Sequence, residues 1–492
     1  MKKIDLGVIV TTLIIVTISC SLAFFAARVV GKPKDINLVA KNVAIAFTDT
    51  SSIASDVISP GWNNVKTFTI TNNSKEDFSY NITIKGLVNT FESINTLQYK
   101  ITSDNGYNMD NYLNVIKTES SKDAVLAYNI TIPKNTIHSY QVEFNYISTE
   151  EDQSEDMGKK LGGTLAIEES TGTPEIYDKL LADNPTIKTR TDFSTTLTET
   201  NVNTLYKATE DNTDVYYFAG NARNNWVKFG GFYWRIIRTN SDGSVRLLYV
   251  GTSADTKKAY IGQTNYNNSD NDSILVGYKY GTSGSLENNR TNENSSLIKT
   301  YIDNWYKDNL TDYTKYLSTT AVYCNDRTVT KDTYTISSGS FYYDAYYRLE
   351  TTFTPTYTCS NSYDAFSFTN VYAKLDYPVG LITADELAYL GITAKSSGTV
   401  DSPYTWVNKN SNGDNAADIW WWTMTPNEYN EYYKQPIMRV AYRGGKIGSS
   451  SVTNTELGAV RPVISIKENT VYKSGDGSAS DPYTIEETSS GC

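Results

Sequence analysis

An uncharged apolar segment near the start, residues 6–27, constrains this chain more than any other feature. As a helix that rises about 1.5 Å per residue, the segment would extend about 33 Å, which is enough to cross the hydrocarbon core of a bilayer. Basic residues stand on both sides of it, with Lys2 and Lys3 before it and Arg28 after it. We therefore expect residues 1–31 to form a signal-anchor with a transmembrane helix, in which residues 6–27 contact the membrane.

Two alternatives to a retained anchor stay open. The segment is longer than the apolar core of about 7–15 residues that is usual in a cleaved signal peptide, which favours an anchor. Small residues at 23–27 nevertheless offer a cleavage site, and Cys20 offers a site for lipid attachment. Lysine and arginine are nearly balanced on the two sides, so they do not set the orientation. From the content of the body, we expect a single-pass protein of the cell membrane whose body is extracellular.

The composition of that body is typical of a β-rich surface protein and argues against two classes of function. The 492 residues carry a net charge of −11, and an acidic chain without a basic stripe binds nucleic acid poorly. We expect no nucleic-acid partner. The 39 tyrosines suit half-buried pleated sheets. A single histidine rules out a multi-histidine zinc site, and we predict neither a metal nor a cofactor.

That histidine, His138, lies in an alternating stretch that predicts a β-strand, and we interpret it as an exposed strand residue. A triad with one histidine stays formally open, but the chain shows no local signature of a nucleophile such as GxSxG. We therefore predict no catalytic residue.

Two of the four cysteines are candidates for a disulfide. Cys20 lies in the apolar segment and Cys492 is the last residue, which leaves Cys324 and Cys359 in one predicted domain. Outside the cell such a pair is expected to be bonded. A reactive or copper-binding thiol pair is the alternative.

The first part of the body, residues 32–168, predicts an all-β sandwich. Short alternating stretches recur at regular intervals, separated by turn sequences rich in Pro, Gly, Asn and Asp. The expected strands cover residues 37–47, 65–72, 78–85, 96–102, 112–117, 124–131, 139–147 and 163–168.

Three motifs in this domain resemble the camelysin/TasA-like surface and biofilm-matrix domains of Gram-positive bacteria. They are AIAFTD at residues 44–49, Pro60-Gly61 before FTITN at 68–72, and the closing GTLAIE at 163–168. Some relatives in that family are called metalloproteases, but this chain has no HExxH motif. The resemblance therefore implies only a fold and a location.

A connector, residues 169–213, follows and contains one short expected helix over 174–182. The larger domain, residues 214–468, opens with an expected β-hairpin over 225–250. Helices are expected over 296–309 and over 383–390, where Thr383 and Glu386 form a capping box. A strand is expected around 438–442, and residues 469–492 read as a Gly/Ser-rich tail with one possible strand over 483–485.

Four separated motifs give the larger domain its resemblance. FGGFYWRII at 229–237, GLIT at 380–383, WWWTMTP at 420–426 and GAVRPVI at 458–464 resemble surface-protein domains of unknown function. Those domains are similar to C-type-lectin-like folds of the formylglycine-generating-enzyme type. The resemblance implies a mixed α+β head domain, and it carries over no enzyme chemistry. The EPN, QPD and WND motifs of calcium-dependent sugar binding do not occur.

Aromatic residues near the end of this domain are the candidate ligand-binding residues. Tryptophan rings stack on flat sugar faces, although in a strand at least one of three successive tryptophans points inward. Tyrosine-rich clusters at 341–347 and 429–433 have the composition of antibody binding loops, and cross-strand pairing is the alternative. The predicted ligand-binding residues are Trp420, Trp422, Tyr429, Tyr432, Tyr433 and Arg443.

These patterns predict a membrane-anchored, non-catalytic surface protein that binds a glycan or a protein ligand through its C-terminal head. Two alternatives remain. One is a structural matrix protein that forms fibres through the first domain. The other is an enzyme of the head, either a carboxylate-based glycosidase or a thiol-dependent oxidase, of which the glycosidase needs two carboxylates about 5–9.5 Å apart.

Overall fold

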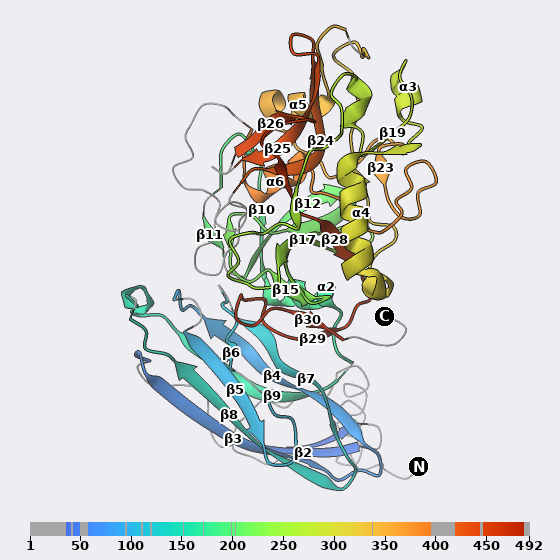
Figure 1. Ribbon diagram of the computed structural model, residues 1–492. Helices are drawn as coiled ribbons and strands as arrows, with labels where there is room; N and C mark the ends of the chain where they lie inside the picture. Colours follow the sequence, from blue (N-terminus) through green and yellow to red (C-terminus); the bar gives the residue numbers. More distant parts are fainter. Residues whose placement is uncertain are drawn as a thin grey trace, which may run out of the picture. The chain divides into compact units, whose positions relative to one another are not determined.

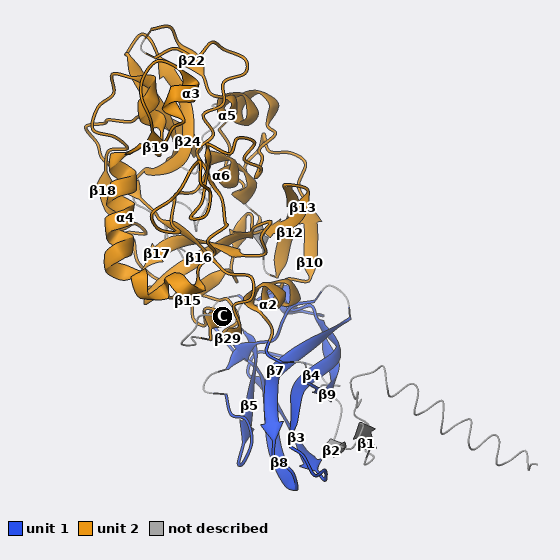
Figure 2. Ribbon diagram, turned by 90° about the vertical axis from the view of Figure 1, so that its right-hand side faces the viewer, with its two compact units in different colours: residues 1–173 blue, residues 174–492 orange. Residues whose placement is uncertain are grey.

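The computed structural model describes two compact units, residues 1–173 and residues 174–492 (Figure 2). The residues described are 36–40, 43–49, 58–93, 96–109, 112–118, 121–150, 152–170, 172–197, 199–201, 203–336, 338–394, 419–442 and 446–486. The predicted transmembrane segment, residues 6–27, lies outside them. Among the described residues, no helix has the length and apolar character needed to cross a membrane.

The first unit consists of two antiparallel sheets (Figure 1). The larger sheet has the order β1-β2-β3-β8-β5-β6, and the smaller has the order β7-β4-β9. In the larger sheet the strands are β1 (Ile36–Ala40), β2 (Val43–Asp49), β3 (Trp62–Asn72), β8 (Thr136–Tyr146), β5 (Leu97–Ser103) and β6 (Leu113–Asn114). In the smaller they are β7 (Lys122–Ile132), β4 (Phe78–Asn89) and β9 (Leu161–Glu169), and a short 3-10 turn, η1 (Ser154–Asp156), precedes β9.

One hydrophobic core lies between these sheets, which confirms the predicted sandwich of β-strands. Alternate residues on β3 and β4 point inward, for example Phe68 and Ile70 on β3 and Ile82 and Ile84 on β4. The stretch expected as one strand over 37–47 is instead the hairpin formed by β1 and β2.

His138 lies on β8 as expected, but its side chain is only 5 % exposed, so the expectation of an exposed residue is wrong. The imidazole Nδ1 lies 3.0 Å from the Tyr80 hydroxyl of β4, and that hydroxyl lies 2.7 Å from the Tyr140 hydroxyl. Burial lowers the pKa of His138. Hydrogen bonds to two tyrosines make burial of the polar ring tolerable.

The second unit contains two larger sheets with helices between their strands in sequence (Figure 1). The first has the order β10-β12-β13-β16-β17-β28, with β15 paired to β16, and the second has the order β18-β27-β24-β25-β26, with β22 paired to β24. The first comprises β10 (Thr186–Thr189), β12 (Thr204–Glu210), β13 (Thr213–Tyr217), β15 (Trp226–Phe229), β16 (Phe232–Thr239), β17 (Val245–Gly251) and β28 (Val463–Ile466). The second comprises β18 (Gly262–Thr264), β22 (Phe341–Tyr342), β24 (Trp421–Asn430), β25 (Gln435–Tyr442), β26 (Lys446–Ser451) and β27 (Gly458–Val460).

Local signals predicted several elements of this unit correctly. The expected hairpin is the antiparallel pair β16 and β17, preceded by β15. The helices are α2 (Ile176–Asp183), α3 (Leu286–Asn289), α4 (Leu297–Asn309), α5 (Asp344–Tyr347) and α6 (Ala384–Leu390). The capping box of α6 forms as predicted, with Thr383 and Glu386 each accepting a backbone hydrogen bond from the other residue.

Residues 174–213 of the connector and the described part of the tail, residues 469–486, are built into the second unit. Strand β10 of the connector pairs in parallel with β12. In the tail, β29 (Tyr472–Ser474) pairs with β30 (Thr484–Ile485), and Tyr483 is fully buried. The Lys228 backbone N–H donates to the Tyr483 carbonyl over 2.9 Å. The possible strand over 483–485 is present as β30, and buried aromatic residues anchor the Gly/Ser-rich tail.

Candidate functional site

The predicted disulfide is confirmed. Cys324, at the end of β21 (Tyr323–Cys324), is bonded to Cys359, with 5.7 Å between the Cα atoms. Cys359 ends a segment, residues 341–359, that contains β22, α5 and the π-helical turn η4 (Arg348–Thr352). The bond fixes this segment, which carries a predicted tyrosine cluster, to β21.

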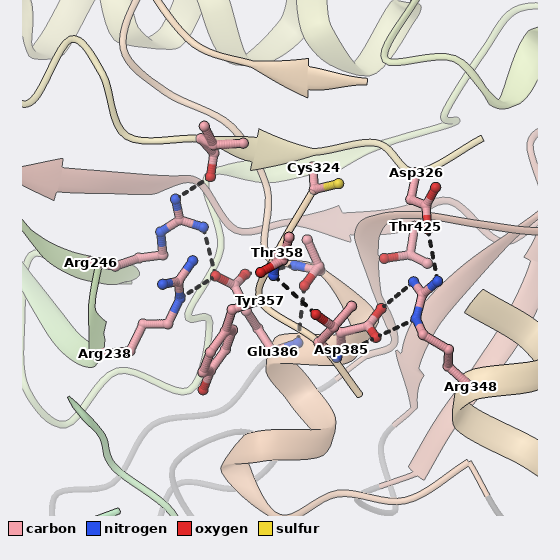
Figure 3. A pocket seen from close by; sticks show the side chains of 13 residues that line it. Arg238, Arg246, Cys324, Asp326, Arg348, Tyr357, Thr358, Asp385, Glu386 and Thr425 are labelled. Carbon is pink, nitrogen blue, oxygen red and sulfur yellow. Dashed lines mark hydrogen bonds and ion pairs between the residues drawn. The ribbon is translucent and has the colours of Figure 1, made fainter. Parts of the chain in front are cut away.

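A polar cleft, shown in Figure 3, includes Cys324 of the disulfide in its lining. Its volume is about 20 Å³, which is room for about one water molecule, and its lining is dominated by charged and hydroxyl side chains. The charged residues are Arg238, Arg246, Asp326, Arg348, Asp385 and Glu386, and the hydroxyl residues include Thr356, Thr358, Thr383 and Thr425.

Glu386, which is 1 % exposed, holds two of the cleft arginines. Its Oε1 accepts from Arg238 Nε over 2.9 Å and from Arg246 Nη1 over 2.6 Å, and its Oε2 accepts from the Thr383 backbone N–H over 2.9 Å. Burial alone would raise the pKa of Glu386, but the two arginines outweigh it and hold the pKa below its usual value. The carboxylate is therefore a fixed anion that joins β16, β17 and α6.

Arg348 makes the second ion-pair group of the cleft (Figure 3). Its Nε and Nη2 donate to the two carboxylate oxygens of Asp385 over 3.0 and 3.2 Å, and its Nη1 donates to Asp326 over 2.9 Å. Asp385 also accepts from the Thr356 backbone N–H over 3.1 Å. Two-point pairing of a guanidinium with a carboxylate restricts both side chains. The arrangement anchors the middle of segment 341–359.

The charged groups of the cleft are thus directed at one another. A general acid for glycoside hydrolysis needs a carboxyl whose pKa is raised, whereas that of Glu386 is lowered. In the described part of the chain, no three metal-ligating side chains come together. The ion pairs of the cleft join segment 341–359 and strands β16 and β17 to α6.

Three of the predicted ligand-binding residues are buried. Trp420 is 3 % exposed, and Trp422 and Tyr429 are fully buried. Trp422 Nε1 donates to the Thr264 carbonyl over 2.8 Å, and the Tyr429 ring stacks on Phe341 with 6.0 Å between centroids. These rings offer no open face to a ligand here, which favours the packing and cross-strand alternatives.

Tyr432 and Tyr433, by contrast, lie in the turn between β24 and β25 and are 85 % and 64 % exposed. Their rings are 4.8 Å apart in an edge-to-face contact. The remaining predicted residue, Arg443, lies outside the described residues.

The two predicted tyrosine clusters are neighbours. Tyr342 of β22 pairs with Glu428 of β24, and the Glu431 backbone N–H donates to the Ser340 hydroxyl over 2.9 Å. These contacts place the start of the β24–β25 turn beside Ser340 and Tyr342, at the N-terminal end of the segment that also bears Tyr346 and Tyr347. We refer to the five partly or largely exposed residues as the tyrosine surface: Tyr342, Tyr346, Tyr347, Tyr432 and Tyr433.

Within this surface the three tyrosines of the first segment pack on each other. Tyr342 and Tyr346 stack with 3.9 Å between centroids, and Tyr347 stands perpendicular to Tyr346 at 5.3 Å. Asp332 holds the group from one side, because its carboxylate accepts from the Tyr347 hydroxyl over 3.0 Å and from the Tyr342 backbone N–H over 2.7 Å.

An arginine and two glutamates adjoin these rings. Arg439 of β25 is 2 % exposed, its Nη1 donates to Glu350 over 2.6 Å, and its guanidinium carbon lies 5.5 Å from the Tyr346 centroid. Glu428 is hydrogen-bonded to Tyr342. Burial first, and the charge of Glu350 second, raise the pKa of Glu428, although Tyr342 and Arg439 act in the opposite direction.

Sequence reasoning missed Asp332, Glu350 and Arg439. Each reaches the tyrosine surface from a different part of the chain, and no local pattern connects them. Glu428 could have been found, since it directly precedes a predicted residue, Tyr429, on the same strand.

Comparison with known protein families found no matching family model, and comparison with curated proteins found no match.

Proposed function

We propose that the protein is a membrane-anchored, extracellular surface protein that binds a glycan or a protein ligand through the tyrosine surface, without catalysis. The observation that carries this proposal is the meeting of two tyrosine-rich segments at one place on the second unit, with Tyr432 and Tyr433 largely exposed. Tyrosine supplies a large, rigid contact area that is apolar on its faces and polar at its tip, at a small cost in conformational entropy.

The rigidity of the first segment supports a binding role. It is held by pairing of β22 with β24, by the two ion pairs of Arg348, and by the disulfide from Cys359. A binding surface that is ordered before the ligand arrives loses less entropy on association, and so binds more tightly for the same contacts.

The location is proposed from the apolar segment at residues 6–27, which is long enough to anchor the chain. In this proposal the first unit is a stalk of the camelysin/TasA-like type, and the second unit is a head of the C-type-lectin-like type. The mixture of sheets and helices in the second unit is compatible with such a head.

The test uses the full-length protein in detergent, applied to a glycan array and to immobilised bacterial surface proteins. The double variant Tyr432→Ala/Tyr433→Ala is compared with Tyr363→Ala/Tyr372→Ala, a second tyrosine pair whose members are 42 % and 52 % exposed and which lies on another loop. We expect the first variant to weaken binding at least about tenfold, as loss of a tyrosine hot spot does.

The control variant should bind as the unchanged protein does. Equal loss in both variants, or no binding to either panel by the unchanged protein, would contradict the proposal.

A further inference from the structure

Two cations of the chain already lie on rings of the tyrosine surface. Lys331 Nζ is 4.4 Å from the Tyr347 centroid, and the guanidinium carbon of Arg439 is 5.5 Å from the Tyr346 centroid. The face of an aromatic ring carries negative charge in its quadrupole, and attracts a cation within about 6 Å. Lys331 is exposed whereas Arg439 is buried, so one ring of the surface, that of Tyr347, already carries an exposed basic side chain.

Acidic side chains outnumber basic ones around these rings. Arg348 is set apart, because it pairs with Asp326 and Asp385 in the cleft. In residues 331–350 and 428–439 the remaining carboxylates are Asp332, Asp344, Glu350, Glu428 and Glu431, and the remaining cations are Lys331, Lys434 and Arg439. This excess of negative charge favours a positively charged ligand.

Glu428 and the groups around it show the same excess of negative over positive charge at a single position. The groups that face it are Tyr342, Arg439, Glu350 and Asn430. Burial and the neighbouring Glu350 raise its pKa in spite of Arg439, so the pairing available within the chain does not offset its desolvation. A further cation brought to this place would stabilise the charged form of Glu428.

On the basis of the proposed binding function, we infer that the tyrosine surface receives lysine and arginine side chains from a basic segment of a partner protein. The aromatic rings contact the cations and the aliphatic stems, while Glu350 and Glu428 accept hydrogen bonds from the ammonium or guanidinium groups. An acidic glycan would meet the same carboxylates as a repulsive field.

The experiment is calorimetric titration of the full-length protein with a synthetic peptide of Lys and Arg spaced by Gly and Ser. A peptide in which Gln replaces every Lys and Arg is the matched probe. We expect only the basic peptide to bind, and its affinity to fall when salt rises from about 0.05 M to about 0.5 M, because salt screens exposed charges. Lysines converted to trimethyllysine should bind more weakly than unmodified lysines but more tightly than Gln, because a quaternary ammonium still contacts aromatic faces but donates no hydrogen bond to Glu350 or Glu428.

Variants separate this site from general attraction to an acidic protein. Glu428→Gln and Tyr432→Ala/Tyr433→Ala should each weaken binding of the basic peptide, the double variant by about tenfold. The control Glu287→Gln/Asp308→Asn removes two exposed charges from the same unit and should leave the affinity within about twofold.

The inference is overturned if the control weakens binding as much as the site variants do. It is also overturned if neutral oligosaccharides bind through Tyr432 and Tyr433 while the basic peptide does not, a result that leaves the proposed binding function intact. If the unchanged protein binds none of the peptides and none of the array ligands, both this inference and the proposed binding function are overturned.

Discussion

Replacement of Asp385 by Asn tests whether the cleft positions the tyrosine-bearing segment. The carboxylate accepts from Arg348 Nε and Nη2 and from the Thr356 backbone N–H, so it contacts segment 341–359 at two places. Asn keeps one acceptor and loses the charge. Hydrogen bonds to charged groups contribute about 1.5–3 kcal/mol each. Because Arg348 still forms its ion pair with Asp326, we expect the substitution to lower the free energy of opening of the segment by about 2–4 kcal/mol.

The assay is amide hydrogen exchange of the full-length protein, read peptide by peptide. If the substitution lowers the free energy of local opening of the segment, the protection factors in residues 341–359 should fall by about 30-fold to several hundredfold. Each loss of about 1.4 kcal/mol lowers a protection factor about tenfold. Protection in β3 and β8 of the first unit should not change. The exposed substitution Glu287→Gln is the matched control.

Unchanged protection of segment 341–359 in Asp385→Asn would refute the argument, because the ion pairs would then not hold the segment. Uniform loss of protection across the second unit would show that the cleft stabilises the whole unit and has no special relation to the tyrosines.

Three further predictions follow from buried groups. Glu386→Gln leaves the Arg246 guanidinium without its carboxylate and should lower the free energy of unfolding of the second unit by about 3–5 kcal/mol in denaturant titration; a loss below about 1 kcal/mol contradicts the network. The disulfide Cys324–Cys359 closes a loop with a sequence separation of 35, so its reduction should lower the free energy of unfolding by about 3–4 kcal/mol and weaken ligand binding. Thermal unfolding and ligand binding are measured in parallel. Because the pKa of His138 is lowered in the folded state, the unfolded state binds more protons as pH falls below about 6.5, so the first unit should lose stability there; His138→Gln should remove that part of the pH dependence, and an unchanged slope would contradict it.

Local patterns predicted the elements that depend on local physics. Alternation placed Phe68 and Ile70 on the buried face of a strand, and the residues of a capping box marked the start of α6. The positions of the cysteines predicted the disulfide, because only two of the four lay in one predicted domain.

Residues whose roles depend on distant partners were not predictable in the same way. Tyr266 packs edge-on against the buried ring of Trp422, a contact that no local sequence pattern reveals. Tyr483 lies among Gly, Ser and Asp but is buried, and its hydroxyl donates to Asp183, far away in the connector. The pairing of Glu350 with Arg439 likewise joins segments that only the folded sheet brings together.

Hydrogen exchange of the full-length protein, with and without a saturating ligand from the array or the peptide panel, tests the central claim most directly. The account predicts that added protection concentrates in residues 331–350 and 428–435, where the tyrosine surface lies. Protection confined to the first unit, or to the loop that bears Tyr363 and Tyr372, would contradict it.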